Sequence, residues 1–236
     1  MNFADMYYQT FITFKKNALQ IILASALALL PIYLMSLAGG FGKILMLLTG
    51  GYLIYCLSAY LLKIVREQNT NIASFFILDK LVILPSIIMG ALLFLLSGLW
   101  SVILIIPGIF VFSMLSMCFH IMSEENLLDP LECFKRSYTL TKKKIWLIVI
   151  ANAIIIILTV ALIVIFIKLI TLIMGAVWYI TVAFHLGGYL LIQLLNLLVL
   201  VTALFSASFL LTMHARLYDE LVKEVDISDF KDYETK

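Results

Sequence analysis

The charged segment 129–144, DPLECFKRSYTLTKKK, is the part of this chain whose residue types and spacing are best suited to chemistry. It holds seven charges in sixteen residues, whereas the whole chain of 236 residues is 64% hydrophobic and 13% charged. Each Lys or Arg close to an anionic lipid leaflet contributes about 1 kcal/mol of binding. The segment therefore predicts contact with anionic headgroups, or plain anchoring at the membrane surface, through its basic residues Lys135, Arg136, Lys142, Lys143 and Lys144.

A helix is predicted to begin at Asp129. Its carboxylate can accept a hydrogen bond from a free N–H of the first turn, and Pro130 has no N–H to leave unpaired. Glu132 can reach back to the cap and can also pair with Arg136 one turn later. The apolar side chains recur at steps of four, three and four, which places on one face Leu127, Leu131, Phe134 and Tyr138. The polar side chains that face away are Glu132, Lys135, Arg136 and Thr139. We expect a surface helix over 123–144 that lies along the membrane.

A second candidate site is a polar patch inside the helical bundle, formed by Asn152, Gln193 and Asn196. Such a patch can receive a lipid headgroup or a small solute. The plainer interpretation is helix packing, since interhelical hydrogen bonds of this kind contribute about 0.6 kcal/mol each.

The sequence offers little for catalysis or metal binding. His120, His185 and His214 fall near the ends of different apolar segments, with the first two expected on opposite sides of the membrane. The three cysteines have no paired spacing and are expected to be small apolar fillers. No Asp, Glu or Arg lies inside an apolar segment, which argues against a coupled transporter. We expect no cofactor, no metal and no enzymatic activity.

The elements that must position these residues are membrane spans. Apolar runs of about 20 residues match a hydrocarbon layer of roughly 30 Å. The mean hydropathy of +1.13 and the placement of the runs predict an all-α polytopic membrane protein with two or three amphipathic surface helices. Turns are expected at 39–42 and 97–101, and Pro31 should bend the first span. The six predicted transmembrane helices cover residues 18–38, 44–63, 81–97, 102–122, 145–167 and 189–213.

Charge placement predicts the orientation. Under this topology 14 of the 16 Lys and Arg residues lie on one side and only Lys43 and Lys168 on the other. Cytoplasmic connections carry the Lys/Arg excess, so both termini are expected in the cytoplasm. The apolar region 171–188 is expected to be re-entrant or interfacial. A seventh span there is the alternative, which would move the C-terminal tail outside.

The whole chain, 1–236, is expected to be a single integral membrane domain with cytoplasmic tails at 1–17 and 214–236. A short internal similarity runs through it, because 13–22 aligns without gaps on 141–150. Residues 73–84 form a weaker third copy. The chain can therefore be interpreted as three helical hairpins, each beginning with a cytoplasmic surface helix, although lysines before a span are expected in any case.

The stretch 106–149 resembles the signature region of the YciC-type bacterial inner-membrane proteins, an uncharacterised family. A related arrangement occurs in the membrane domain of some glycerophosphodiester phosphodiesterases. The resemblance implies the bacterial inner membrane and brings no known activity or active site. The matching features are Pro107-Gly108 in a span, the acidic turn Ser123-Glu124-Glu125, Lys135-Arg136-Ser137 in the amphipathic helix, and Leu140-Thr141 before the next span.

Three function hypotheses remain open from the sequence. The first is a non-enzymatic membrane protein that organises lipid or protein partners, with anionic headgroups at the cytoplasmic face and no nucleic acid among its partners. The second is a channel or transporter for lipid or a hydrophobic solute. The third, an integral membrane enzyme, is the weakest because no reactive set of residues is present.

Overall fold

The computed structural model describes residues 3–68, 70–76, 80–103, 117–125, 127–142, 144–146, 148–154 and 187–224, with separate positions in 111–115 and 157–168. For a few of these, among them 97–103 and 187–196, it describes the backbone alone. All regular elements in this part of the chain are helices, as the composition predicts. In chain order they are α1 Phe3–Lys16, α2 Ala18–Leu37, α3 Gly39–Val65, the short 3-10 helix η1 Ile72–Ser74, α4 Lys80–Ile103, α6 Cys118–Glu125, α7 Pro130–Thr141 and α9 Gly187–Glu224.

Helices α2 and α3 form an antiparallel hairpin that matches the first two predicted spans. The turn between them is shorter than expected. The chain reverses at Ala38 and Gly39, where Gly39 has a φ of +69° that favours glycine. The expected turn at 39–42 is therefore wrong in its extent, because Gly40 to Gly42 already belong to α3. Helix α2 continues through Pro31 to Leu37, and the bend expected at Pro31 stays a prediction.

Helix α4 crosses α3 at a pair of glycines. A Cβ atom on Gly51 would overlap the backbone of Ser86, and one on Gly90 would overlap the backbone of Gly51. Small residues at such a crossing let two membrane helices approach closely. The turn expected at 97–101 is wrong, because α4 runs unbroken to Ile103. The Ser and Gly residues of that stretch do not stop a helix whose other residues favour it.

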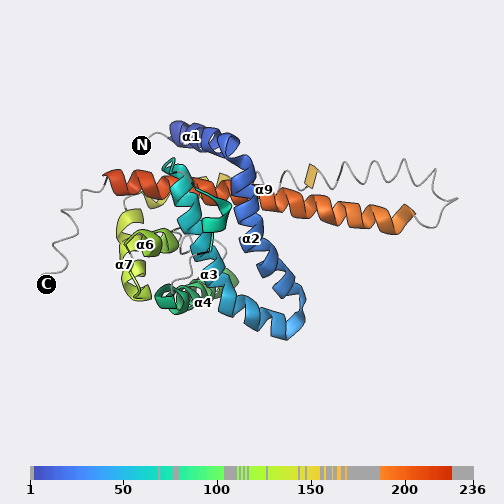
Figure 1. The fold of residues 1–236 in the computed structure, drawn as a ribbon, viewed down its shortest axis with the longest axis horizontal. Coiled ribbons are helices and arrows are strands. Elements are labelled where there is room, and N and C mark those ends of the chain that lie inside the picture. Colours follow the sequence, from blue (N-terminus) through green and yellow to red (C-terminus); the bar gives the residue numbers. More distant parts are fainter. Residues whose placement is uncertain are drawn as a thin grey trace, which may run out of the picture.

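Helix α9 is the longest element, with 38 residues. It contains the predicted span 189–213 and continues eleven residues further, so the first half of the expected charged tail at 214–236 is helical. Its C-terminal half packs against α1, α2 and α3, and its N-terminal half extends away from the other described helices (Figure 1).

Three of the described helices are long and apolar enough to cross a membrane, over Ala18–Met35, Gly39–Val65 and Val199–Lys223. A shorter apolar stretch covers Leu81–Leu93. These helices are compatible with a membrane protein. The six-span topology stays a prediction, since 102–122 and 145–167 lie partly, and 171–186 wholly, outside the described residues.

The buried core lies at one end of this assembly. In α3 the buried side chains are concentrated between Gly51 and Val65, whereas the half of α3 near Ala38 is largely exposed. Tyr60, Ile121 and Tyr218 are among the fully buried side chains and come from α3, α6 and α9. The same end carries the ion pairs described next, and we refer to it as the charged end, defined by Lys16, Arg66, Glu124 and Asp219.

Candidate functional site

Arg66 occupies the centre of the charged end, directly after α3. The last turn of α3 closes with hydrogen bonds from Glu67 N–H to the Ile64 carbonyl (3.0 Å) and from Gln68 N–H to the Lys63 carbonyl (3.0 Å). Glu67 adopts a φ of +56°, a conformation that usually belongs to glycine at this position after a helix. This tight ending holds Arg66 over the neighbouring helices.

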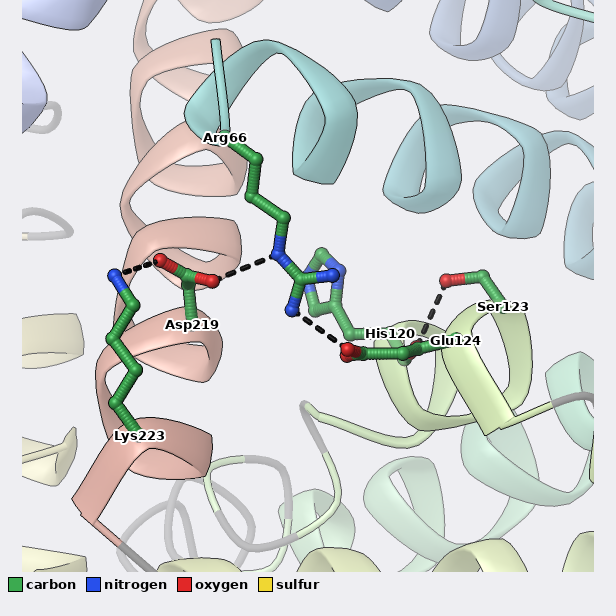
Figure 2. Close-up of polar contacts among 6 residues, drawn as sticks. All are labelled: Arg66, His120, Ser123, Glu124, Asp219 and Lys223. Carbon is green, nitrogen blue, oxygen red and sulfur yellow. Dashed lines mark hydrogen bonds and ion pairs between the residues drawn. The ribbon is translucent and has the colours of Figure 1, made fainter. Parts of the chain in front are cut away.

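The Arg66 guanidinium joins three helices (Figure 2). Its Nε donates to Asp219 Oδ1 of α9 at 2.8 Å, and its Nη2 donates to Glu124 Oε1 of α6 at 2.8 Å. Lys223 lies 2.7 Å from the second oxygen of Asp219. Burial lowers the pKa of Arg66, but the hydrogen bonds to Asp219 and Glu124 outweigh it and raise the pKa above its usual value. The set is balanced, with two cations and two carboxylates.

Asp219 is the most buried member of this set, with 6% of its surface exposed. Removing one partner from a buried pair leaves an uncompensated charge and typically costs about 3–5 kcal/mol. The second link at this end is weaker. Lys16 reaches Glu67 at 3.3 Å, but both side chains are mostly exposed, and exposed pairs contribute about 0–1 kcal/mol. The Arg66 set therefore fastens the ends of α3, α6 and α9, and the Lys16 pair adds little.

His120 lies beside this set. Its ring stacks on Tyr218, with centroids 5.5 Å apart and planes inclined by 22°. Figure 2 shows the imidazole behind the Arg66 guanidinium, with the Ser123 hydroxyl bonded to the His120 carbonyl at 2.8 Å. Within the described residues, Nδ1 of His120 is buried and has no hydrogen-bond partner. Of the other two histidines, His214 belongs to the polar chain described next, and His185 lies outside the described residues.

A buried polar chain runs through the bundle below the charged end. The Asn152 amide nitrogen donates to the Ser113 hydroxyl at 2.9 Å, and the Asn152 carbonyl oxygen lies 2.6 Å from Nε2 of His214. An amide oxygen can only accept, so Nε2 carries the proton of His214. All three side chains are at most 3% exposed. Both ends of the Asn152 amide are occupied, as in an interhelical link.

The structure does not bring the other members of the predicted polar patch to Asn152. Gln193 and Asn196 precede His214 on α9 by 21 and 18 residues. At a rise of about 1.5 Å per residue, Asn196 lies roughly 27 Å along the helix from the residue that Asn152 contacts. The partners of Asn152 are Ser113 and His214 instead.

Helix α7 begins where the sequence predicts. The Asp129 carboxylate accepts from Leu131 N–H at 2.9 Å, and Pro130 is the first helical residue. The stretch expected as one surface helix, 123–144, contains the end of α6 and all of α7. The side of α7 that packs on the other described helices is not the apolar face expected to lie along the membrane. Its buried residues are Cys133, Ser137, Leu140 and Thr141, whereas Leu131 and Tyr138 are 62% and 50% exposed.

The basic residues of this region divide into two groups. Arg136 pairs with Glu125 across the α6–α7 turn at 2.5 Å, whereas the expected pair with Glu132 stays a prediction. Lys135 and Lys142 are exposed, and Lys144 is half-buried. Lys143 lies outside the described residues. With Leu131 and Tyr138, the two exposed lysines repeat at steps of four, three and four, so that one outward face of α7 alternates apolar and basic side chains.

Like α7, helix α1 packs one face on the bundle and turns apolar and basic side chains outward. It buries Met6, Thr10 and Phe14 at steps of four, and the Phe14 ring packs edge-on against Phe205 and Phe209 of α9 at 5.0 and 5.6 Å. Its outward face carries the exposed apolar residues Tyr8, Phe11 and Ile12, followed by the exposed Lys15. Each of the two helices is followed by residues outside the helix, at Asn17 after α1 and at Lys142 and Lys144 after α7.

The Arg66 set was not predicted, because 214–236 was expected to be a cytoplasmic tail. A signal for the helix that continues into this region is nevertheless present in the sequence. Leu217, Tyr218, Leu221 and Val222 recur at helical spacing among the charges, which is typical of a helix with one buried face. The pairing of Arg66 with Glu124 and Asp219 spans 58 and 153 residues of chain, and no local pattern indicates it.

The described residues show no arrangement suited to metal binding, since no group of three or more His, Cys, Asp or Glu side chains is placed to hold an ion. The three cysteines are free and buried, as predicted. Burial, and then the nearby carboxylates, raise the pKa of the Cys133 thiol to about 12, which keeps it protonated and unreactive.

No protein-family model, curated protein or solved structure matches the chain.

Proposed function

We propose that the protein is a non-enzymatic protein of the bacterial inner membrane that binds and organises anionic lipid at the cytoplasmic face. The observation that carries this proposal is the outward face of α7, where Leu131, Lys135, Tyr138 and Lys142 are all exposed. Apolar side chains that enter the headgroup boundary, next to lysines that reach phosphates, are typical of helices that lie in a membrane interface.

The second surface helix supports the same interpretation. Helix α1 turns Tyr8, Phe11, Ile12 and Lys15 outward while it packs on α9 through Phe14. Two short helices with outward faces of one kind suit a protein that engages many lipids along a surface. The buried faces of both helices hold them on the bundle without any contribution from lipid.

The orientation is also part of the proposal. The ion pairs gather Lys16, Arg66 and Lys223 at one end of the bundle, in accord with the 14 to 2 distribution of Lys and Arg. The excess of basic residues favours the cytoplasmic side for this end. The resemblance of 106–149 to YciC-type proteins supports an inner-membrane location.

The test is the lipid content of the protein purified in a mild detergent. We expect phosphatidylglycerol and cardiolipin to be enriched over their share of the membrane, and the double variant K135Q/K142Q to lose most of that enrichment. The matched control is K43Q, an exposed lysine beyond the Ala38 turn, which should change nothing. A lipid profile equal to that of the bulk membrane would contradict the proposal.

A further inference from the structure

A pocket of about 500 Å³ opens at the charged end, between the end of α3 and the last turns of α9. Three cations line it, namely Arg66, Arg216 and Lys223. The apolar part of its wall comes from Val65 and Val222, and its acidic residues are Glu67 and Asp219. The lining therefore combines three basic, two acidic and two apolar side chains.

The charges around this pocket do not cancel. Asp219 is shared by Arg66 and Lys223, Glu124 is bound by Arg66, and Glu67 lies against Lys16. Within the part of the chain that the structure describes, Arg216 has no carboxylate partner, and its Nη1 donates only to the Thr13 hydroxyl, at 3.3 Å. The half-buried guanidinium of Arg216 is thus the surplus cation of the pocket.

The position of Arg216 suits a headgroup. It lies within the last two turns of the apolar stretch Val199–Lys223, where a spanning helix leaves the hydrocarbon layer. A planar guanidinium matches a phosphate with two parallel hydrogen bonds, which a single ammonium cannot do. Thr13 comes from α1, whose neighbouring Phe14 is fixed against α9, so the contact between α1 and α9 holds the group in place.

We propose that Arg216, supported by Arg66 and Lys223, binds the phosphate of an anionic phospholipid in this pocket, with the lipid chains directed toward the apolar part of α9 that precedes Arg216. This inference rests on the proposed lipid-binding function and assigns it a specific site. The site is separate from the outward face of α7, which we propose to contact the lipid surface less specifically.

The test is native mass spectrometry of the full chain in detergent, titrated with phosphatidylglycerol, with phosphatidylethanolamine and with soluble glycerol phosphate. We expect one tightly bound phosphatidylglycerol, weaker binding of phosphatidylethanolamine and no competition by glycerol phosphate. R216Q should weaken phosphatidylglycerol binding about tenfold or more, the factor expected from loss of one charge-assisted pair. R216K should have an intermediate affinity, because it keeps the charge and the stem but loses the fork.

The controls separate this site from the proposed function. K135Q/K142Q should leave the single tight site unchanged, and a thermal melt of R216Q near that of the unaltered protein would show that the variant is folded. Unchanged phosphatidylglycerol binding in R216Q, with an effect of K135Q/K142Q on total lipid, would overturn this site and leave the proposed function standing. Competition by glycerol phosphate at equal affinity would show that the pocket binds a free phosphate compound as well as it binds a lipid, which would contradict the proposed phospholipid ligand. If neither the unaltered protein nor any variant preferred anionic lipid, both the Arg216 site and the proposed function would be overturned.

Discussion

The two ends of the α2–α3 hairpin differ in how they are held together. At the charged end, Arg66, Glu124 and Asp219 form hydrogen-bonded ion pairs around a buried core. At the opposite end, around Ala38, the large apolar side chains are exposed, with Leu34 at 62%, Leu37 at 64% and Phe41 at 72%. Figure 1 shows the hairpin and the N-terminal half of α9 extending away from the packed end.

In the membrane that we propose, this difference reflects the surroundings of each part. Lipid tails are as apolar as leucine, so a side chain such as Leu34 within the span would gain little from packing against another helix. The charged end would meet headgroups and water, where apolar burial and paired charges both matter. Near the Ala38 turn, α2 and α3 are linked by a hydrogen bond from the Thr49 hydroxyl to the Met35 sulfur at 3.3 Å.

The largest effect is expected when one residue type is compared at the two ends. Leu61→Ala, in the fully buried part of α3, should cost about 2–5 kcal/mol, because it leaves a cavity. Leu34→Ala, near the Ala38 turn, should change stability by less than about 0.5 kcal/mol, since it removes little packing. The unfolding temperatures of the two variants measure this difference in stability. A large loss at Leu34 would mean that this end is packed against something else.

A second comparison uses the most buried charge. Asp219→Asn should lower the free energy of unfolding by about 1.5–3 kcal/mol, because the buried Asp219 loses its charge-assisted hydrogen bonds, although Arg66 keeps Glu124 and Lys223 is mostly exposed. The matched control is Glu67→Gln in the exposed pair with Lys16, expected to cost under about 1 kcal/mol. Thermal unfolding in detergent measures both. Equal effects of the two substitutions would show that the Arg66 set does not hold the charged end together.

The third comparison tests close approach away from the charges. Gly51→Ala should cost about 1–3 kcal/mol, because its Cβ would overlap the backbone of α4 and force the crossing apart. Gly40→Ala in the same helix has no atom within 4 Å of the new Cβ and should be neutral or slightly stabilising. Both values come from the same unfolding assay. A neutral Gly51→Ala would contradict the tight α3–α4 crossing.

Local patterns predicted much of the fold. The apolar runs indicated α2 to within one residue and α3 to within five residues at its start and two at its end, and the Asp129-Pro130 pair correctly predicted the start of α7. The errors lay where a weak local signal competed with helix continuity, as at 97–101 in α4, or where charges hid an apolar repeat, as beyond His214 in α9.

The candidate sites were harder to predict, because they depend on contacts between distant parts of the chain. Amphipathic spacing identified α7 but not which face packs, since its buried face is made of small residues such as Cys133 and Ser137. Asn152 was identified from its polarity, yet its partner His214 was assigned to a span end with no role. Arg216 carried no motif and became a candidate only once Thr13, Arg66 and Lys223 were seen around it.

The central claim is that the charged end lies at the cytoplasmic face. The most direct measurement is labelling of single cysteines, in a background without the three native ones, by a membrane-impermeant thiol reagent on intact and on opened cells. We expect Phe41→Cys to react in intact cells and Gln68→Cys to react only after the cells are opened. Labelling of Gln68→Cys in intact cells would place the charged end outside and contradict the account.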